Sequence, residues 1–527
     1  MSMSLQQLVR PWIADAIVHQ PLADPMIDTL TLDSRKAQPG CAFVALAGAR
    51  THGYAHAAQA IGLGASAILL DPDGLGPSRI DGPAAQIEIP ALRAKLGSLA
   101  ARFYGVLAQQ IGVVGVTGTN GKTSIVQLLA QALTRLGAAV GTQGTLGSGL
   151  YPALESGERT TPDALATQAF LARMQRAGAQ YVAMEVSSHA LDQQRVAGTA
   201  FKVAVLSNLS RDHLDYHGSM VAYAEAKAKL FDWPDLAAAV INQDDAFGSR
   251  LLDQRLLAER LLAERVCAPR LIGYGLDSTC EVRASALRYT PQGLQFELHF
   301  GREHFAVQSE LLGRFNVYNL LAVASSLLAL GYATHAIADV IAQLKPIHGR
   351  MNRLGGCQQS DHQALINQAP TNQALKAQAA KAQALVVVDY AHTPDGLEQA
   401  LTAVRAHAPG RLTVVFGCGG DRDRGKRPEM GAIAARLADY CIVTDDNPRT
   451  EPRQNITDDI LAGMHGHTVL VQHDRAQAIK LAIAQSRPGD VVLIAGKGHE
   501  TYQEIGTQLL PFDDTQVASQ ALQEAVL

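Results

Sequence analysis

Short apolar runs alternate with longer Ala- and Leu-rich stretches along most of the chain. Runs of this kind, bounded by turns and separated by helical stretches, predict βαβ units and a mainly parallel sheet with helices on its faces. We therefore expect an α/β protein. The apolar runs that we expect to form strands are residues 41–46, 67–70, 111–116, 181–186, 203–206, 238–241, 384–388, 412–416, 440–444 and 491–495.

The alternation divides into three parts, and a chain of 527 residues is long enough for about three domains of ordinary size. Residues 1–104 predict a small α/β domain. Residues 105–348 predict a central domain with a mainly parallel sheet and helices on both faces. Residues 349–527 predict a Rossmann-like, doubly wound domain. In such sheets, ligands bind at the carboxyl ends of the strands.

Two segments interrupt this pattern. Residues 255–265 contain a tandem repeat of good helix formers, which we interpret as a surface extension. Residues 355–383 are rich in Gln and Ala and have little periodicity, as in an exposed or partly disordered insertion. We assign no chemistry to either segment.

Composition limits the possible partners and the compartment. The net charge is −4 and the pI is near 6.5, which gives no support for nucleic acid or an anionic membrane as a partner. The 6 cysteines are dispersed without a C-x-x-C pair, as in proteins of a reducing cytosol. The N-terminus lacks a signal-peptide core and no apolar run reaches membrane-spanning length. We expect a cytoplasmic protein without membrane insertion.

The run 111–116 leads into a Gly-rich loop, after which a helical pattern begins. Strand, Gly loop, Lys-Thr and helix form an arrangement that holds a nucleotide triphosphate, because loop amides and the helix end face the phosphates. The generic spacing would place its first glycine at Val116, so that motif is not met, and a simple tight turn is the alternative. The expected loop comprises Gly115, Val116, Thr117, Gly118, Thr119, Asn120, Gly121, Lys122 and Thr123.

Polar residues also follow other predicted strands. Glu185 stands at the end of the run 181–186, where a carboxylate beside a phosphate loop is suited to Mg²⁺. His213 follows the run 203–206, although either residue could be an ordinary polar loop end. In the last domain, three strands lead into Gly-rich or Pro-containing turns that each carry an Arg or a Glu, which a structural turn would not require. These segments are residues 417–423, 446–449 and 496–500.

The loop Gly-Thr-Asn-Gly-Lys-Thr and the motifs that follow it in order resemble the Mur ligases. These are ATP-dependent enzymes that add amino acids to the UDP-linked precursor of the bacterial cell wall. The C-terminal motifs resemble those of the members that add diaminopimelate. Folylpolyglutamate synthetases carry a similar loop, and a P-loop ATPase that acts as a switch is a second alternative. The N-terminal segment 32–34 and the segment 446–449 argue against a folylpolyglutamate synthetase. Against a switch ATPase, no strand with a terminal Asp of the Walker-B kind is obvious, and the C-terminal motifs would have no use.

This resemblance implies a monomeric enzyme that uses ATP and Mg²⁺. It implies that the enzyme adds meso-diaminopimelate to the D-Glu of UDP-MurNAc-L-Ala-D-Glu (UDP-N-acetylmuramoyl-L-alanyl-D-glutamate). It implies a CO2-derived carbamate on Lys227, with Lys229 as a nearby competitor. It implies catalytic roles for Lys122, Lys227, His213 and Arg350, and Mg²⁺ binding by Thr123, Glu185, His213 and Lys227. Besides the loop, it implies ATP contacts by Asn316, Arg350 and Asp389. It implies contacts to the UDP-muramoyl-dipeptide by Leu32, Ser34, Thr160, Thr161, Ser187, Gln193 and Arg195. It implies contacts to diaminopimelate by Arg422, Asp446, Asn447, Pro448, Arg449, Gly496 and Glu500.

Overall fold

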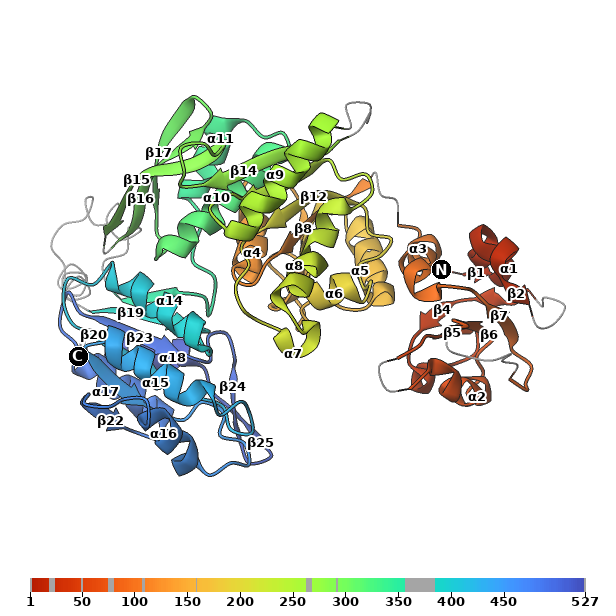
Figure 1. The fold of residues 1–527 in the computed structure, drawn as a ribbon. Helices are drawn as coiled ribbons and strands as arrows, with labels where there is room; N and C mark the ends of the chain where they lie inside the picture. Colours follow the sequence, from red (N-terminus) through yellow and green to blue (C-terminus); the bar gives the residue numbers. More distant parts are fainter. Residues whose placement is uncertain are drawn as a thin grey trace, which may run out of the picture. The chain divides into compact units, whose positions relative to one another are not determined.

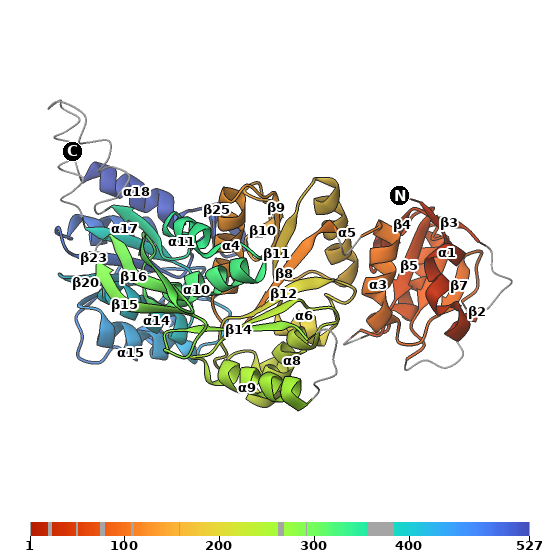
Figure 2. The same cartoon turned by 90° about the horizontal axis from the view of Figure 1, so that it is seen from above.

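The computed structural model divides into two compact units, Met1–Ile272 and Gly273–Leu527. Figures 1 and 2 show the elements of each unit from two directions. The boundary falls within strand β14 (Arg270–Gly275). The structure describes residues 2–18, 24–48, 51–73, 80–106, 110–157, 159–261, 268–290, 292–355 and 384–525.

The first unit begins with a five-stranded sheet in the order β2-β7-β6-β5-β4. Strands β4 to β7 are parallel, and β2 pairs with β7 in the antiparallel sense. Helix α3 (Leu92–Tyr104) follows the sheet and buries Leu96 and Leu99 in its core. The strands are β2 (Ile17–Val18), β4 (Thr29–Thr31), β5 (Cys41–Ala45), β6 (Ala67–Leu70) and β7 (Ala85–Glu88).

A second sheet in this unit carries the Gly-rich loop. Within this unit its strand order is β10-β9-β11-β8-β12-β13, and Figure 2 shows β8 between β11 and β12. All of these strands are parallel except β10. The strands are β8 (Gly112–Thr117), β9 (Val140–Gly144), β10 (Gly147–Leu150), β11 (Tyr181–Glu185), β12 (Phe201–Leu206) and β13 (Ala238–Asn242).

Helices cover both faces of this sheet because its strands are apolar on both faces. Val113 of β8 packs in a cluster with Leu171 and Met174 of α5 (Ala164–Arg176). Helix α4 (Lys122–Arg135) contacts β9 and β11. The later helices of the unit are α6 (Ser188–Asp192), α7 (Leu214–His217), α8 (Met220–Ala228) and α9 (Ala246–Leu261).

The second unit begins with strands that the parallel pattern did not predict. β14 pairs with β15 (Val282–Thr290) in parallel, and β16 (Gly293–Phe300) and β17 (Glu303–Ser309) continue as an antiparallel meander. β15 alternates between buried and partly exposed residues at first, as a sheet with one solvated face does. Helices α10 (Arg314–Ala329) and α11 (Thr334–Ala342) follow.

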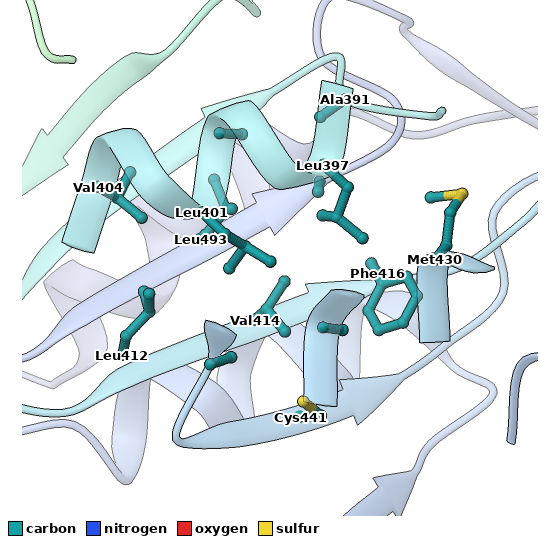
Figure 3. Close-up of a cluster of buried hydrophobic side chains, with 14 of the residues drawn as sticks. Ala391, Leu397, Leu401, Val404, Leu412, Val414, Phe416, Met430, Cys441 and Leu493 are labelled. Atoms are coloured by element: carbon teal, nitrogen blue, oxygen red, sulfur yellow. The ribbon is translucent and has the colours of Figure 1, made fainter. Parts of the chain in front are cut away.

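The remaining sheet of the second unit has the order β18-β19-β23-β20-β21-β22, with only β18 antiparallel. Side chains alternate between its faces, as the two-residue repeat of a strand requires. Leu412, Val414 and Phe416 face a cluster that includes Leu401 of α14 (Figure 3). The strands are β18 (Asn352–Gly355), β19 (Leu385–Asp389), β20 (Leu412–Phe416), β21 (Tyr440–Val443), β22 (Val469–Val471) and β23 (Val491–Ala495).

Helices lie on both faces of this sheet, so it is doubly wound. Val415 of β20, which follows Val414 in the chain, joins a separate cluster with Ile479 of α17 and Ala518 of α18. After β23 the chain forms a hairpin of two short strands, β24 (Tyr502–Ile505) and β25 (Gln508–Pro511). The helices are α14 (Pro394–Arg405), α15 (Lys426–Leu437), α16 (Arg453–Leu461), α17 (Arg475–Ala484) and α18 (Asp514–Glu524).

The α/β fold and every strand predicted from an apolar run are confirmed, with ends that differ by at most two residues. The three domain boundaries stay a prediction. Residues 255–261 of the tandem repeat lie in α9, whereas the rest of the repeat and residues 356–383 lie outside the described residues. Within the described ranges, each helix is too short or too polar to cross a membrane.

Candidate active site

The Gly-rich loop joins β8 to α4. Gly118 has a φ of 145° and Gly121, which caps α4, has a φ of 86°, and only glycine adopts such values readily. A Cβ atom on Gly118 would also collide with Oγ of Ser207. The positive dipole end of the helix therefore lies at a loop that can approach phosphate oxygens closely.

The loop is braced by the segment that follows β12. Ser207 Oγ donates to the carbonyl of Asn120 at 2.6 Å, and the Asn120 amide donates to Asn208 Oδ1 at 3.0 Å. Lys122 folds back over the loop, where Nζ donates to the carbonyls of Gly118 at 2.9 Å and Thr119 at 2.8 Å. The lysine ammonium thus lies against the loop that is expected to bind phosphates.

Glu185, at the end of β11, is 1% exposed. Its carboxylate accepts from Thr123 Oγ1 at 3.0 Å and from the Thr145 amide at 2.7 Å. A hydroxyl and a carboxylate are hard oxygen donors of the kind that Mg²⁺ prefers. The structure brings these two predicted ligands together beside the first turn of α4, so their chemistry fits the metal.

Lys227 lies on α8 and is 1% exposed. Its Nζ donates to the carbonyl of Gly118 at 2.7 Å and lies 4.5 Å from the ring centre of Tyr223. Burial, together with the positive charge of Lys122, lowers the pKa of Lys227 well below its ordinary value. Lys229 is instead half-exposed and forms an ion pair with Asp192 at 2.9 Å. The structure thus separates a buried lysine at the loop from a solvated one.

His213 is more exposed than Thr123 and Glu185, which are both buried. It has a φ of 53°, a side chain that is 45% exposed, and a contact of 3.4 Å from Nε2 to Asp212. Its ring lies 4.8 Å from that of His189 and 6.1 Å from that of Tyr223. In the part of the chain that the structure describes, no three His, Cys, Asp or Glu side chains are grouped to hold a metal. A role for His213 at the metal stays a prediction.

Four of the residues expected to contact the UDP-muramoyl-dipeptide lie near the end of β11: Thr161, Ser187, Gln193 and Arg195. Thr161 Oγ1 donates to the carbonyl of Glu185 at 2.8 Å and accepts from the Ser187 amide at 3.2 Å. Arg195 donates to the carbonyl of Thr161 at 3.2 Å and to Gln193 Oε1 at 3.0 Å. These contacts place a guanidinium next to the Glu185 region.

Two further members of that set have local partners. Thr160 Oγ1 lies 3.1 Å from Thr145 Oγ1, next to Glu185. Ser34, in the N-terminal sheet region with Leu32, donates to Gln59 Oε1 at 2.8 Å. The uridine and dipeptide roles of these residues stay predictions.

In the second unit, Arg350 and Asp389 lie together. The Asp389 carboxylate accepts from the Met351 amide at 2.7 Å, and burial raises its pKa although the charge of Arg350 opposes the shift. The Arg350 guanidinium lies 4.8 Å from the ring centre of Tyr390. Asn316 is buried at the start of α10, where its amide donates to the carbonyl of Leu312 at 2.8 Å. Nucleotide contacts by these three residues stay predictions.

The three C-terminal motifs lie at one edge of the doubly wound sheet, because β20, β21 and β23 are parallel. The Gly420 amide donates to the carbonyl of Asn447 at 2.9 Å, and Arg449 Nη1 donates to the carbonyl of Gly420 at 2.9 Å. A Cβ built on Gly419 would lie 3.0 Å from Arg449 Nη1 and 3.6 Å from Arg422 Cγ. The two predicted arginines therefore flank one Gly-rich turn.

Lys497, which the sequence did not single out, links two of these motifs. This fully buried lysine donates to Asn447 Oδ1 at 2.9 Å and to Glu500 Oε2 at 2.9 Å, and Asn447 Nδ2 donates to the same Glu500 oxygen at 3.0 Å. Burial alone would raise the pKa of Glu500, but the charge and hydrogen bond of Lys497 and the bond from Asn447 lower it. Glu500 is thus held as a carboxylate. The only sequence signal for Lys497 was its position in the motif at residues 496–500.

Arg427 is a second buried cation that sequence reasoning missed. It forms ion pairs with Glu451 at 2.7 Å and Asp459 at 2.9 Å and donates to the carbonyl of Gly419 at 3.2 Å. The hydrogen bond from Arg427 lowers the pKa of Glu451 to about 2. This cluster fixes the turn that carries Arg422.

A phosphate loop beside a buried carboxylate, in a chain whose last sheet ends in Arg- and Glu-bearing turns, defines a P-loop enzyme that uses a nucleotide. Family models match in three places: "Mur ligase family, catalytic domain" at residues 26–104, "Mur ligase middle domain" at 116–327 and "Mur ligase, glutamate ligase domain" at 375–498.

Individual proteins agree with the family models. The chain is 52% identical over 504 residues to a UDP-N-acetylmuramoyl-L-alanyl-D-glutamate–2,6-diaminopimelate ligase of Xanthomonas campestris pv. campestris, covering 95% of this chain and 94% of the relative. It is 48% identical to a ligase of the same name from Pseudomonas aeruginosa, covering 97% and 98%. A solved structure of a ligase of this name has a TM-score of 0.71 at 35% identity, covering 99% of both chains. The chain belongs to the Mur ligase family, and it is an ATP-dependent ligase.

Proposed function

We propose that this chain joins meso-diaminopimelate to the D-Glu γ-carboxylate of UDP-N-acetylmuramoyl-L-alanyl-D-glutamate, with ATP converted to ADP and phosphate, in the synthesis of peptidoglycan precursors. The names of the relatives support this assignment. The observation that carries it is the Asp446–Arg449 turn, which presents a guanidinium beside the Asn447–Lys497–Glu500 group. A cation and carboxylates at one sheet edge suit an amino acid with a second ammonium and a second carboxylate.

The chemistry requires activation of a carboxylate, because oxide is too poor a leaving group for direct attack by an amine. Transfer of the terminal phosphoryl group of ATP to the γ-carboxylate gives an acyl phosphate and ADP. The neutral amine of diaminopimelate then attacks the carbonyl carbon, a tetrahedral state forms, and inorganic phosphate leaves as the amine loses a proton. The main tasks of the protein are positioning and charge neutralisation.

The residues around the loop suit the phosphoryl transfer. The Lys122 ammonium and the N-terminus of α4 stabilise negative charge on the transferring group. Thr123 and Glu185 would hold Mg²⁺, which supplies further charge neutralisation when it is bound.

The environment of Lys227 supports a carbamate. CO2 reacts with a neutral amine, and the lowered pKa of Lys227 favours that form. The ammonium first loses one proton, and the neutral nitrogen then bonds to the carbon of CO2 with loss of a second proton. The cation thus becomes an anionic carbamate with two oxygen ligands. Lys227 then becomes a second source of oxygen ligands next to Gly118. We further propose that the protein acts as a monomer in the cytoplasm.

Arg449 is the residue that we propose to bind the distal carboxylate of diaminopimelate. A guanidinium grips a carboxylate with two parallel hydrogen bonds, which an ammonium does not reproduce. Arg449→Ala should lower kcat/KM for meso-diaminopimelate by about a hundredfold or more, and Arg449→Lys should recover little of it. Steady-state kinetics with ATP and the UDP-linked substrate at saturation measures this loss. A folded Arg449→Ala variant with wild-type kcat/KM would contradict the assignment of the pocket.

A phosphate-release assay separates the proposed function from its rivals. A folylpolyglutamate-type ligase would release phosphate with a folate acceptor and glutamate, and a switch ATPase would do so with ATP alone. The proposed ligase should release phosphate only when the UDP-muramoyl-dipeptide and meso-diaminopimelate are both present. A rate of phosphate release that does not depend on the UDP-linked acceptor would refute the proposal.

A further inference from the structure

A short hairpin lies just beyond residue 498, where the match to the last family model ends. Its strands are β24 (Tyr502–Ile505) and β25 (Gln508–Pro511), which pair in the antiparallel sense. All four residues of β25 are exposed. A two-stranded hairpin has little stability by itself, so its position depends on the contacts that β24 makes with the rest of the unit.

Those contacts are with the turn that carries Arg449. The Arg449 amide donates to the carbonyl of Glu504 at 3.1 Å, and the Gly506 amide donates to the carbonyl of Arg449 at 2.8 Å. Arg449 and Ile505 therefore form an isolated parallel bridge. Arg449 has a φ of 52°, which is uncommon for a residue other than glycine and persists only where the surroundings impose it.

The hairpin also holds the two residues at the start of that turn. Gln503 Nε2 donates to the carbonyl of Asp446 at 2.8 Å. The Glu504 amide donates to Asn447 Oδ1 at 2.9 Å, which is the oxygen that also accepts from Lys497. The conformation of the turn is thus imposed by β24 as well as by its own sequence.

The side chain of Arg449 is fixed by the same strand. Its Nε lies 2.7 Å from Glu504 Oε2, and its Nη1 donates to the carbonyl of Gly420 at 2.9 Å. The two side chains are 20% and 31% exposed. Glu504 therefore occupies the Nε edge of the guanidinium. Nη1 and Nη2 together carry four N–H groups, of which one donates to Gly420, so this edge keeps donors for a second carboxylate.

We propose that the β24–β25 hairpin is a specificity element and that Glu504 is a positioning residue, which aims the Nη1–Nη2 edge of Arg449 at the distal carboxylate of the amino-acid substrate. This inference rests on the proposed function. Glu504 does not touch the substrate; its effect is to fix the orientation of Arg449 before the substrate binds, so that binding does not have to order that side chain.

Variants at Glu504 test this role with a readout that a general structural role would not give. Glu504→Ala should raise KM for meso-diaminopimelate by about tenfold or more, with kcat within about twofold and KM for ATP unchanged, because a charge-assisted hydrogen bond that orders Arg449 is lost. The preference for meso-diaminopimelate over L-lysine should fall by the same factor. Glu504→Gln should lie between wild type and Glu504→Ala, since its amide oxygen still accepts a hydrogen bond.

Glu524→Ala is the matched control. Glu524 forms an ion pair with Lys480 at 3.1 Å elsewhere in the unit, so this variant should keep the wild-type KM and preference. If Glu504→Ala fails to fold, the nearly isosteric Glu504→Gln supplies the readout.

Three outcomes would overturn the inference. One is an unchanged or lower KM for meso-diaminopimelate in Glu504→Ala. Another is a loss of kcat shared by all substrates together with a lower melting temperature. The third is a wild type that does not use meso-diaminopimelate, which would remove the proposed function as well. If wild type uses this amino acid and Glu504→Ala discriminates as well as wild type, only the inference about Glu504 fails.

Discussion

Lys122→Ala should abolish ligation while the protein stays folded. The Lys122 ammonium donates to the carbonyls of Gly118 and Thr119, which both belong to the loop, so we expect the sheet to stay intact without it. Its proposed partner is the phosphoryl group that is transferred from ATP, which carries negative charge during the transfer. Removal of a preorganised cation at such a position costs on the order of a thousandfold in kcat. Phosphate release under saturating substrates measures the loss.

Circular dichroism and the melting temperature should show that the Lys122→Ala variant is folded. Lys202→Ala is a suitable control, because Lys202 is exposed on β12 and should keep full activity. Near-normal ligation by folded Lys122→Ala would refute the assignment of the phosphate loop.

Lys227→Ala should be nearly inactive and should recover part of its activity when a small carboxylic acid such as acetate is added. The truncated side chain leaves space beside Gly118, because Lys227 is almost fully buried. A free carboxylate in that space would supply the two oxygen ligands that the carbamate supplies in the wild type. The measurement is kcat as a function of acetate concentration at constant ionic strength.

Lys229→Ala is the matched control, two residues along the chain. Lys229 is half-exposed and paired with Asp192, so its removal should cost little activity and acetate should have no effect. Equal acetate responses in the two variants, or a high-resolution crystal structure of active wild type with unmodified Lys227, would contradict the carbamate.

The sequence predicted strands best where burial is complete. Residues 111–116 and 491–495 are apolar on both faces because helices cover both sides of their sheets, and the strands appear there. The meander β15–β17 was missed because its strands have partly exposed residues and no crossover helices between them. The hairpin β24–β25 was missed because it is short and exposed.

The candidate site shows the same division between local and distant information. The glycines of the loop and the Asp446–Arg449 turn are local patterns, and both lie at strand ends as expected. The choice between Lys227 and Lys229 depends on which one is buried against Gly118, and that is a contact across more than a hundred residues of chain. The ion pair between Arg449 and Glu504 joins two elements that no sequence motif connects.

The most direct test of the proposed function is the wild-type kcat/KM for meso-diaminopimelate and for L-lysine, measured by phosphate release with the UDP-muramoyl-dipeptide and ATP at saturation. The two amino acids differ by one carboxylate at the far end of the side chain. Lysine would leave the Arg449 guanidinium without its partner, so we predict a preference for meso-diaminopimelate of at least about a hundredfold. Equal values for the two amino acids, or a preference for lysine, would contradict the assignment even if the protein proves to be a ligase.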